Sequence, residues 1–157
     1  MAQFREKVEA MKLDAMRQLT QGDDKSARAQ LKAARRVIAD LEALEKGGKT
    51  PRTLTDAEEL KVLRKAVDTS RESAHALDDA GHRERAEEEL AVAHFIGQLL
   101  PSVLSLTETR KLVDSIIEEQ NLSGLGKRGI GRVMGAVKGR LDVDPATVST
   151  VAAQKLG

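Results

Sequence analysis

The sequence predicts an all-α protein in which about four long helices are followed by a small three-helix domain. Apolar residues recur at steps of three and four along nearly the whole chain, which is the spacing of one face of a helix. No window alternates apolar and polar residues as a strand does. Glycine and proline interrupt the helical pattern at a few places, and these interruptions divide the chain into separate helices.

The first two predicted helices are separated by a short polar turn. An apolar stripe covers residues 4–19, and Gly22 ends the first helix. Asp23 or Asp24 is placed to cap the second helix, because a carboxylate oxygen accepts a hydrogen bond from a backbone N–H in the first turn. The apolar positions of this second helix continue until Gly47.

The next two helices follow a linker that contains glycine and proline. Thr55 with Glu58 three residues later forms the pattern of a capping box, which predicts a helix start. From Leu60 to Leu77 the apolar residues alternate steps of three and four, a seam suited to packing against another long helix. A fourth helix is expected over residues 86–100, ending before Pro101.

The sequence pattern changes near Pro101, after which the predicted helical segments are shorter and glycines are more frequent. We therefore predict an N-terminal domain over residues 1–101 and a tail domain over residues 102–157. The first tail helix is expected from about Thr107 to Glu119, and a second is buried through Ile130, Val133, Met134 and Val137. The third is capped by Asp144 and has Pro145 in its first turn.

Composition excludes several classes of protein. With 40% apolar and 32% charged residues, the chain of 157 residues is typical of a globular protein, and no run is long enough to cross a membrane. The absence of cysteine removes disulfides, thiol nucleophiles and cysteine-ligated metals, and no leader pattern opens the chain. We therefore expect a cytoplasmic protein with no membrane partner.

Charge is divided unevenly along the chain. Residues 1–119 hold 20 basic and 23 acidic side chains, whereas residues 120–157 hold six basic and two acidic ones. Five of these six basic residues lie within 14 residues that contain no acid: Lys127, Arg128, Arg132, Lys138 and Arg140. Such a cluster is either a solvated face or a surface that contacts nucleic-acid phosphates.

Glycines recur every fourth residue through the same segment, at Gly131, Gly135 and Gly139. On a helix they would leave one side without side chains, although each glycine costs about 1 kcal/mol relative to alanine. Close packing of a neighbouring helix is the more common reason for such spacing. The alternative is close approach of a sugar–phosphate backbone to the bare helix.

No recognised catalytic or cofactor motif accompanies these residues. A literal G-x-G-x-x-G begins at Gly124, but a dinucleotide site needs a preceding strand, and a helix is predicted there instead. The three histidines lie in polar or helix-end positions without partners at metal-ligand or nucleophile spacing. We therefore expect no catalytic residues, no metal and no small-molecule cofactor.

Three blocks of residues, in order along the chain, resemble the YqeY-like family. The first block comprises Met11-Lys12, Ala15-Met16, Asp24-Lys25 and residues 31–34. The second comprises Arg71-Glu72-Ser73, Ala80-Gly81, Ala86-Glu87, residues 89–92 and Leu100-Pro101. The third comprises residues 131–135, Lys138-Gly139-Arg140 and a closing helix that ends in Leu156-Gly157. The third block is the most specific. Only Ala136-Val137 separate its two parts, fewer residues than the family usually has, and Leu99 stands where an aromatic residue is common.

The resemblance implies a helical domain followed by a three-helix tail. The C-terminal half of the family is related to the tail domain of the B subunit of glutamyl/aspartyl-tRNA amidotransferase, which helps to hold the tRNA body. The catalytic core of that subunit has no counterpart here. A carbon–nitrogen ligase activity with glutamine as nitrogen donor would therefore be assigned to this chain only because of the family relation. We expect an accessory protein that binds tRNA or another structured RNA through the five basic residues, with Gly131 and Gly135 admitting the backbone.

Two other functions remain open. The chain could be a subunit or partner in glutamine-dependent tRNA amidation, working with amidotransferase subunits or an aminoacyl-tRNA synthetase. It could instead be a helical protein-interaction module in which the seam from Leu60 to Leu77 is partly exposed and takes a partner helix or a second copy.

Overall fold

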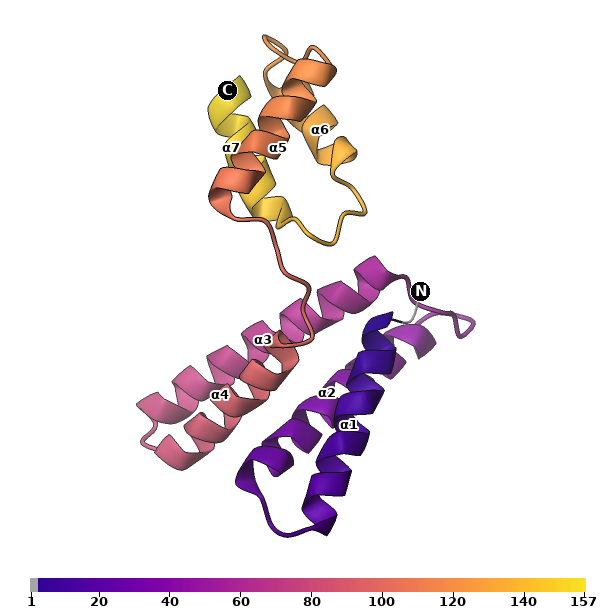
Figure 1. Ribbon diagram of the computed structural model, residues 1–157, viewed down its shortest axis with the longest axis vertical. Helices are drawn as coiled ribbons and strands as arrows, with labels where there is room; N and C mark the ends of the chain where they lie inside the picture. The colour runs from indigo at the N-terminus through magenta and orange to yellow at the C-terminus, as the bar shows by residue number, and fades with distance from the viewer. Residues whose placement is uncertain (1–2) are drawn as a thin grey trace. The chain divides into compact units, whose positions relative to one another are not determined.

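The computed structural model describes residues 3–157, and within them the chain forms seven helices and no strand (Figure 1). The all-α prediction is confirmed. The helices are α1 (Gln3–Thr20), α2 (Lys25–Lys46), α3 (Asp56–Asp79), α4 (Arg83–Gly97), α5 (Leu106–Glu119), α6 (Lys127–Ala136) and α7 (Pro145–Leu156). They divide into two compact units, the first extending through Leu100 and the second from Pro101 to Gly157. None of the described helices is both long and apolar enough to cross a bilayer.

Helix starts follow the local chemistry of the chain. Asp24 caps α2 by accepting a hydrogen bond from the N–H of Ser26, and Thr55 and Glu58 form the predicted capping box of α3. The cap of α7 by Asp144 is also confirmed. In the tail, α5 begins at Leu106 rather than Thr107, because Ser105 and Glu108 form a second capping box that the sequence analysis overlooked.

The N-terminal unit consists of two helical hairpins, α1 with α2 and α3 with α4, and α2 also packs on α4 (Figure 1). Its core contains Phe4, Val37 and Leu63, together with many alanines that allow the helices to approach closely. Glu59 of α3 completes this unit by accepting a hydrogen bond from the N–H of Arg5 at 2.8 Å. One helix thus caps the start of another across the fold.

The seam predicted along α3 is part of this core. Leu60, Leu63 and Val67 are buried, and so are Ser70 and Ala74 further along. Leu77, at the end of the seam, is half-buried. Most of the seam is therefore covered within the unit, which leaves little of it open to a partner helix and weakens the premise of the interaction-module hypothesis.

The C-terminal unit packs α6 and α7 together and α5 against both. Its core is almost entirely aliphatic, with Val113, Leu122, Val133 and Val148 fully buried. The segment before α5 is attached to the loop before α7 by a hydrogen bond of 2.7 Å from the N–H of Leu104 to the carbonyl of Asp142. This small bundle fixes the orientation of α6, which carries most of the basic cluster.

Candidate nucleic-acid interface

Helix α6 has one buried side and one bare, basic side. Val133 and Gly129 face the core of the unit, and Ile130 and Met134 are half-buried beside them. The remaining positions are exposed: Lys127, Arg128, Gly131, Arg132, Gly135 and Ala136. Since a helix turns by 100° per residue, Gly131 and Gly135 lie between Lys127 on one side and Arg132 on the other.

The two glycines of this exposed side are not packed against a neighbouring helix. Within residues 3–157, a Cβ atom built on Gly131 or Gly135 would meet no atom within 4 Å other than those of its chain neighbours and of its own helix backbone. Gly129 is the contrasting case, because its Cβ would lie 2.8 Å from Cδ1 of Leu156 and 3.3 Å from the carbonyl oxygen of Leu122. Helix packing therefore explains Gly129, whereas it does not explain Gly131 and Gly135.

Gly139, the third member of the predicted ladder, does not belong to the helix. Helix α6 ends at Ala136, and Gly139 lies in the following turn with φ of +85°. This is the left-handed region that glycine adopts without strain. The prediction of three glycines on one helix side was therefore wrong, and only Gly131 and Gly135 share a side.

The start of α6 carries charges opposite to those that stabilise a helix N-terminus. Gly126 is the N-cap residue and supplies no side-chain hydrogen bond, and the first turn contains no acid. Lys127 and Arg128 lie there instead, although the helix dipole favours negative charge at this end. The backbone N–H groups and the two cations together suit an anion such as a phosphate oxygen.

Lys138 and Arg140 follow the helix and differ in how they are held. Lys138 is exposed in the turn after α6 and forms no ion pair with any described residue. Arg140 donates from Nε and Nη2 to the two carboxylate oxygens of Asp142, at 2.9 and 2.8 Å. These hydrogen bonds lower the pKa of Asp142 and raise that of Arg140. Within residues 3–157, four of the five predicted cations therefore have no ion-pair partner, and Arg140 is partly neutralised by Asp142.

Comparison with known families supplies an assignment for the whole chain. The family described as Yqey-like protein matches residues 7–156. The chain belongs to the YqeY-like family. The match begins in α1 and ends at the last residue of α7, so both units of the YqeY-like chain are included, and the resemblance noted from the three sequence blocks is confirmed. Comparison with curated proteins finds no significant match.

The described His, Asp and Glu side chains of the YqeY-like chain do not form a cluster of the kind that binds a metal. Within residues 3–157, no three His, Asp or Glu side chains come together in a group that could hold a metal ion. His94 Nε2 lies 3.0 Å from Nε2 of Gln98, and His75 Nε2 lies 3.4 Å from the carboxylate of Asp79 on the exposed surface of α3.

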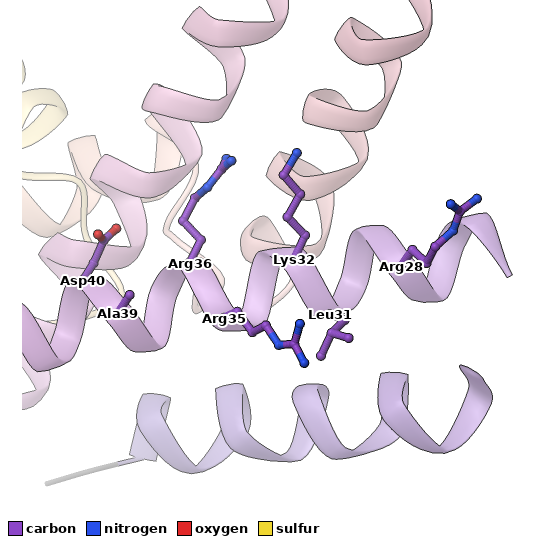
Figure 2. A pocket seen from close by; sticks show the side chains of 7 residues that line it. All are labelled: Arg28, Leu31, Lys32, Arg35, Arg36, Ala39 and Asp40. Atoms are coloured by element: carbon purple, nitrogen blue, oxygen red, sulfur yellow. The ribbon is translucent and has the colours of Figure 1, made fainter. Parts of the chain in front are cut away.

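A trough along α2 is a feature of the YqeY-like N-terminal unit that the sequence analysis overlooked. It is lined by Arg28, Leu31, Lys32, Arg35, Arg36, Ala39 and Asp40 (Figure 2). Figure 2 shows Lys32 and Arg36 pointing to one side of α2 and Arg35 to the other, toward α1. The signal was present in the sequence, because residues 25–39 contain five basic side chains and no acid.

Most cations of this trough are already paired. Arg36 and Lys32 both reach Glu89 of α4, and Arg28 lies 3.1 Å from Asp23. Arg35 forms no ion pair within the described part of the chain. The trough is consequently much less basic than its α2 sequence suggests, and the exposed side of α6 is the stronger candidate for binding an anion.

Proposed function

We propose that this YqeY-like protein is an RNA-binding accessory protein whose C-terminal unit contacts the sugar–phosphate backbone of a structured RNA, with tRNA as the preferred class. The observation that carries the proposal is the exposed side of α6. There, two glycines that no other part of the described chain covers lie beside Lys127, Arg128 and Arg132, none of which forms an ion pair within residues 3–157.

Each part of this side suits a backbone contact. Positively charged side chains bind phosphates and release counterions. The absent Cβ atoms of Gly131 and Gly135 let a bulky ribose and phosphate approach the helix closely. The whole chain has two phenylalanines and no tyrosine or tryptophan, so few side chains are able to stack on unpaired bases. Recognition of RNA by its shape and its sugar–phosphate backbone is therefore favoured.

The preference for tRNA rests on the resemblance between the tail and the RNA-holding domain of the amidotransferase B subunit. In this proposal the YqeY-like protein holds RNA, and any amide-forming chemistry belongs to a partner. A direct check is to incubate the purified protein with misacylated tRNA, glutamine and ATP, for which we expect no turnover.

Binding of bulk deacylated tRNA to the full chain tests the proposal. The variant Lys127→Ala/Arg128→Ala/Arg132→Ala should bind at least about tenfold more weakly at low salt. The slope of log affinity against log salt concentration should also flatten by about two to three, since each of the three lost phosphate contacts removes roughly 0.7 to 0.9. Circular dichroism should show unchanged helix content, because all three side chains are exposed.

A matched control distinguishes a defined contact from a general effect of charge. Arg110 and Lys111 are exposed on α5 in the same unit and form no ion pair with any described residue, so the variant Arg110→Ala/Lys111→Ala removes cations away from α6. We expect it to bind tRNA nearly as the unchanged protein does. The proposal fails if the α6 variant retains full affinity, or if the control loses as much affinity per removed charge.

A further inference from the structure

A second hollow of the N-terminal unit lies between the C-terminal half of α2 and the N-terminal half of α3. Its volume is about 720 Å³. It is lined by Arg36, Asp40, Ala43, Leu44, Glu58, Lys61, Val62, Lys65, Ala66 and Thr69. The α3 side spans Glu58 to Thr69, a length of about 16 Å or three helical turns. We call this hollow the α2/α3 groove.

The floor of the α2/α3 groove is apolar. Val62 is half-buried and Leu44 is 39% exposed although it is a large aliphatic side chain, and Ala43 and Ala66 complete the floor. This surface lies on a different side of α3 from the buried seam. Ala43 and Leu44 are exposed and Val62 is half-buried, whereas Ala66 is buried beneath them. An apolar surface that stays partly open to solvent favours an apolar partner over an RNA backbone.

The charged residues of the groove divide into paired and unpaired ones. Arg36 donates a hydrogen bond to Glu89. Both carboxylate oxygens of Glu58 accept hydrogen bonds from the terminal nitrogens of Arg52, at 2.9 and 2.8 Å. Hydrogen bonds from Arg52 lower the pKa of Glu58 to about 2, so the ionised carboxylate of Glu58 is already paired with Arg52. Among residues 3–157, Lys61 and Lys65 on α3 and Asp40 on α2 form no salt bridge, although the charge of Asp40 attracts the Arg36 guanidinium and helps to raise its pKa.

The unpaired charges give the two rims opposite signs. Lys61 and Lys65 are one helical turn apart on the α3 rim, where both are exposed, and Asp40 is exposed on the α2 rim. A helix lying in the groove would present its apolar stripe to Leu44 and Val62. Acidic residues along one flank would then meet the two lysines, and a basic residue on the other flank would meet Asp40.

We propose that the α2/α3 groove docks an amphipathic helix of a partner protein, oriented by acidic residues of that helix against Lys61 and Lys65. The length of the groove fits about three turns of such a helix, and its apolar floor with polar rims is the usual arrangement of helix-in-groove recognition. This site is separate from the RNA contact proposed for α6 and does not depend on it.

Two synthetic helical peptides test the proposal on the protein of residues 1–157. Both carry the same leucine stripe at helical spacing, one with glutamates along the flank that meets α3 and the other with lysines there. The acidic peptide should bind at least about tenfold more tightly, since two opposite-charge contacts replace two like-charge ones. Methyl NMR signals of Leu44 and Val62 should move on binding of the acidic peptide.

Charge reversal in the groove provides the decisive variant. Lys61→Glu/Lys65→Glu should lose the preference for the acidic peptide and favour the lysine peptide, an inversion that unfolding cannot produce. Arg71→Glu is the matched control, because Arg71 is exposed on α3 outside the groove and makes no ion pair. It should leave the preference unchanged, as should the α6 variant that weakens RNA binding.

Three outcomes would overturn the proposal. The first is that neither peptide binds, and the second is that the Lys61→Glu/Lys65→Glu variant keeps the original preference. The third is that the Leu44 and Val62 methyl signals shift with protein concentration alone, which would assign the groove to a second copy of this chain instead of a partner helix.

Discussion

Arg36 holds Glu89 through both of its terminal nitrogens, with Nη1 2.8 Å from Oε2 and Nη2 3.1 Å from Oε1. Nη1 also donates to the hydroxyl of Ser70 at 2.8 Å, so one guanidinium joins α2 to α3 and α4. Lys32 Nζ lies 3.1 Å from the same carboxylate. Because Glu89 and Ser70 are buried, these hydrogen bonds satisfy groups that would otherwise destabilise the fold.

Removal of this carboxylate should be costly. The variant Glu89→Ala leaves the half-buried Arg36 with the Ser70 hydroxyl but without a carboxylate partner, and we expect the free energy of unfolding to fall by roughly 2 to 4 kcal/mol. Urea unfolding followed by circular dichroism measures the loss. Glu87→Ala is the control, since Glu87 is exposed on the same helix without an ion pair, and it should change stability by less than about 0.5 kcal/mol.

The same ion pair makes stability depend on pH. Hydrogen bonds from Arg36 hold the pKa of Glu89 below its usual value. Its stabilising contribution is therefore complete above the unfolded-state pKa of about 4.3 and is lost as pH falls through the lower folded-state pKa. In Glu89→Gln, the unfolding free energy should fall less steeply below pH 4 than in the unchanged protein. Parallel curves for the two proteins would show that other carboxylates cause the acid sensitivity.

The helices of this protein were predictable because their signals are local. The capping residues Thr55 with Glu58 and Asp144 lie within one turn of the backbone groups they bind, so spacing alone identified them. Ser105 with Glu108 carried the same pattern and was overlooked. The burial of the α3 seam was harder to predict, because spacing shows that a stripe is apolar but does not show which helix covers it.

The candidate sites depend on contacts that sequence spacing does not contain. Gly131 and Gly129 differ only in which side of α6 they occupy, and the packing of Leu156 decides which one is covered. Arg140 looked as free as Arg132, yet the turn after α6 brings it to Asp142. The α2/α3 groove likewise depends on how α2 and α3 are placed relative to each other, and no sequence motif indicates that placement.

The three glycines of α6 should respond differently to alanine. Gly131→Ala and Gly135→Ala add a methyl group in open space within a helix, and each should raise the free energy of unfolding of the C-terminal unit by roughly 1 kcal/mol. Gly129→Ala should give no such gain and should lower stability, because its methyl group would press on Leu156 and the carbonyl of Leu122. Hydrogen exchange of α5 to α7 measures each change.

The glycine variants also separate stability from RNA binding. If RNA approaches the bare side of α6 closely, the stabilised Gly131→Ala/Gly135→Ala protein should bind tRNA several-fold more weakly while its net charge is unchanged. Equal or tighter binding by this stabilised protein would show that the glycines serve no close contact with RNA.

Asp142 limits the charge that the C-terminal unit offers to RNA. Its pKa is lowered by Arg140, so the carboxylate is ionised at neutral pH and holds the guanidinium. The variant Asp142→Asn should release Arg140, strengthen tRNA binding about threefold and steepen the salt dependence by up to about one phosphate contact. Glu119→Gln makes the same change in net charge at the exposed end of α5 and should have a smaller effect. If the two variants strengthen binding equally, net charge explains the gain and Arg140 makes no contact of its own.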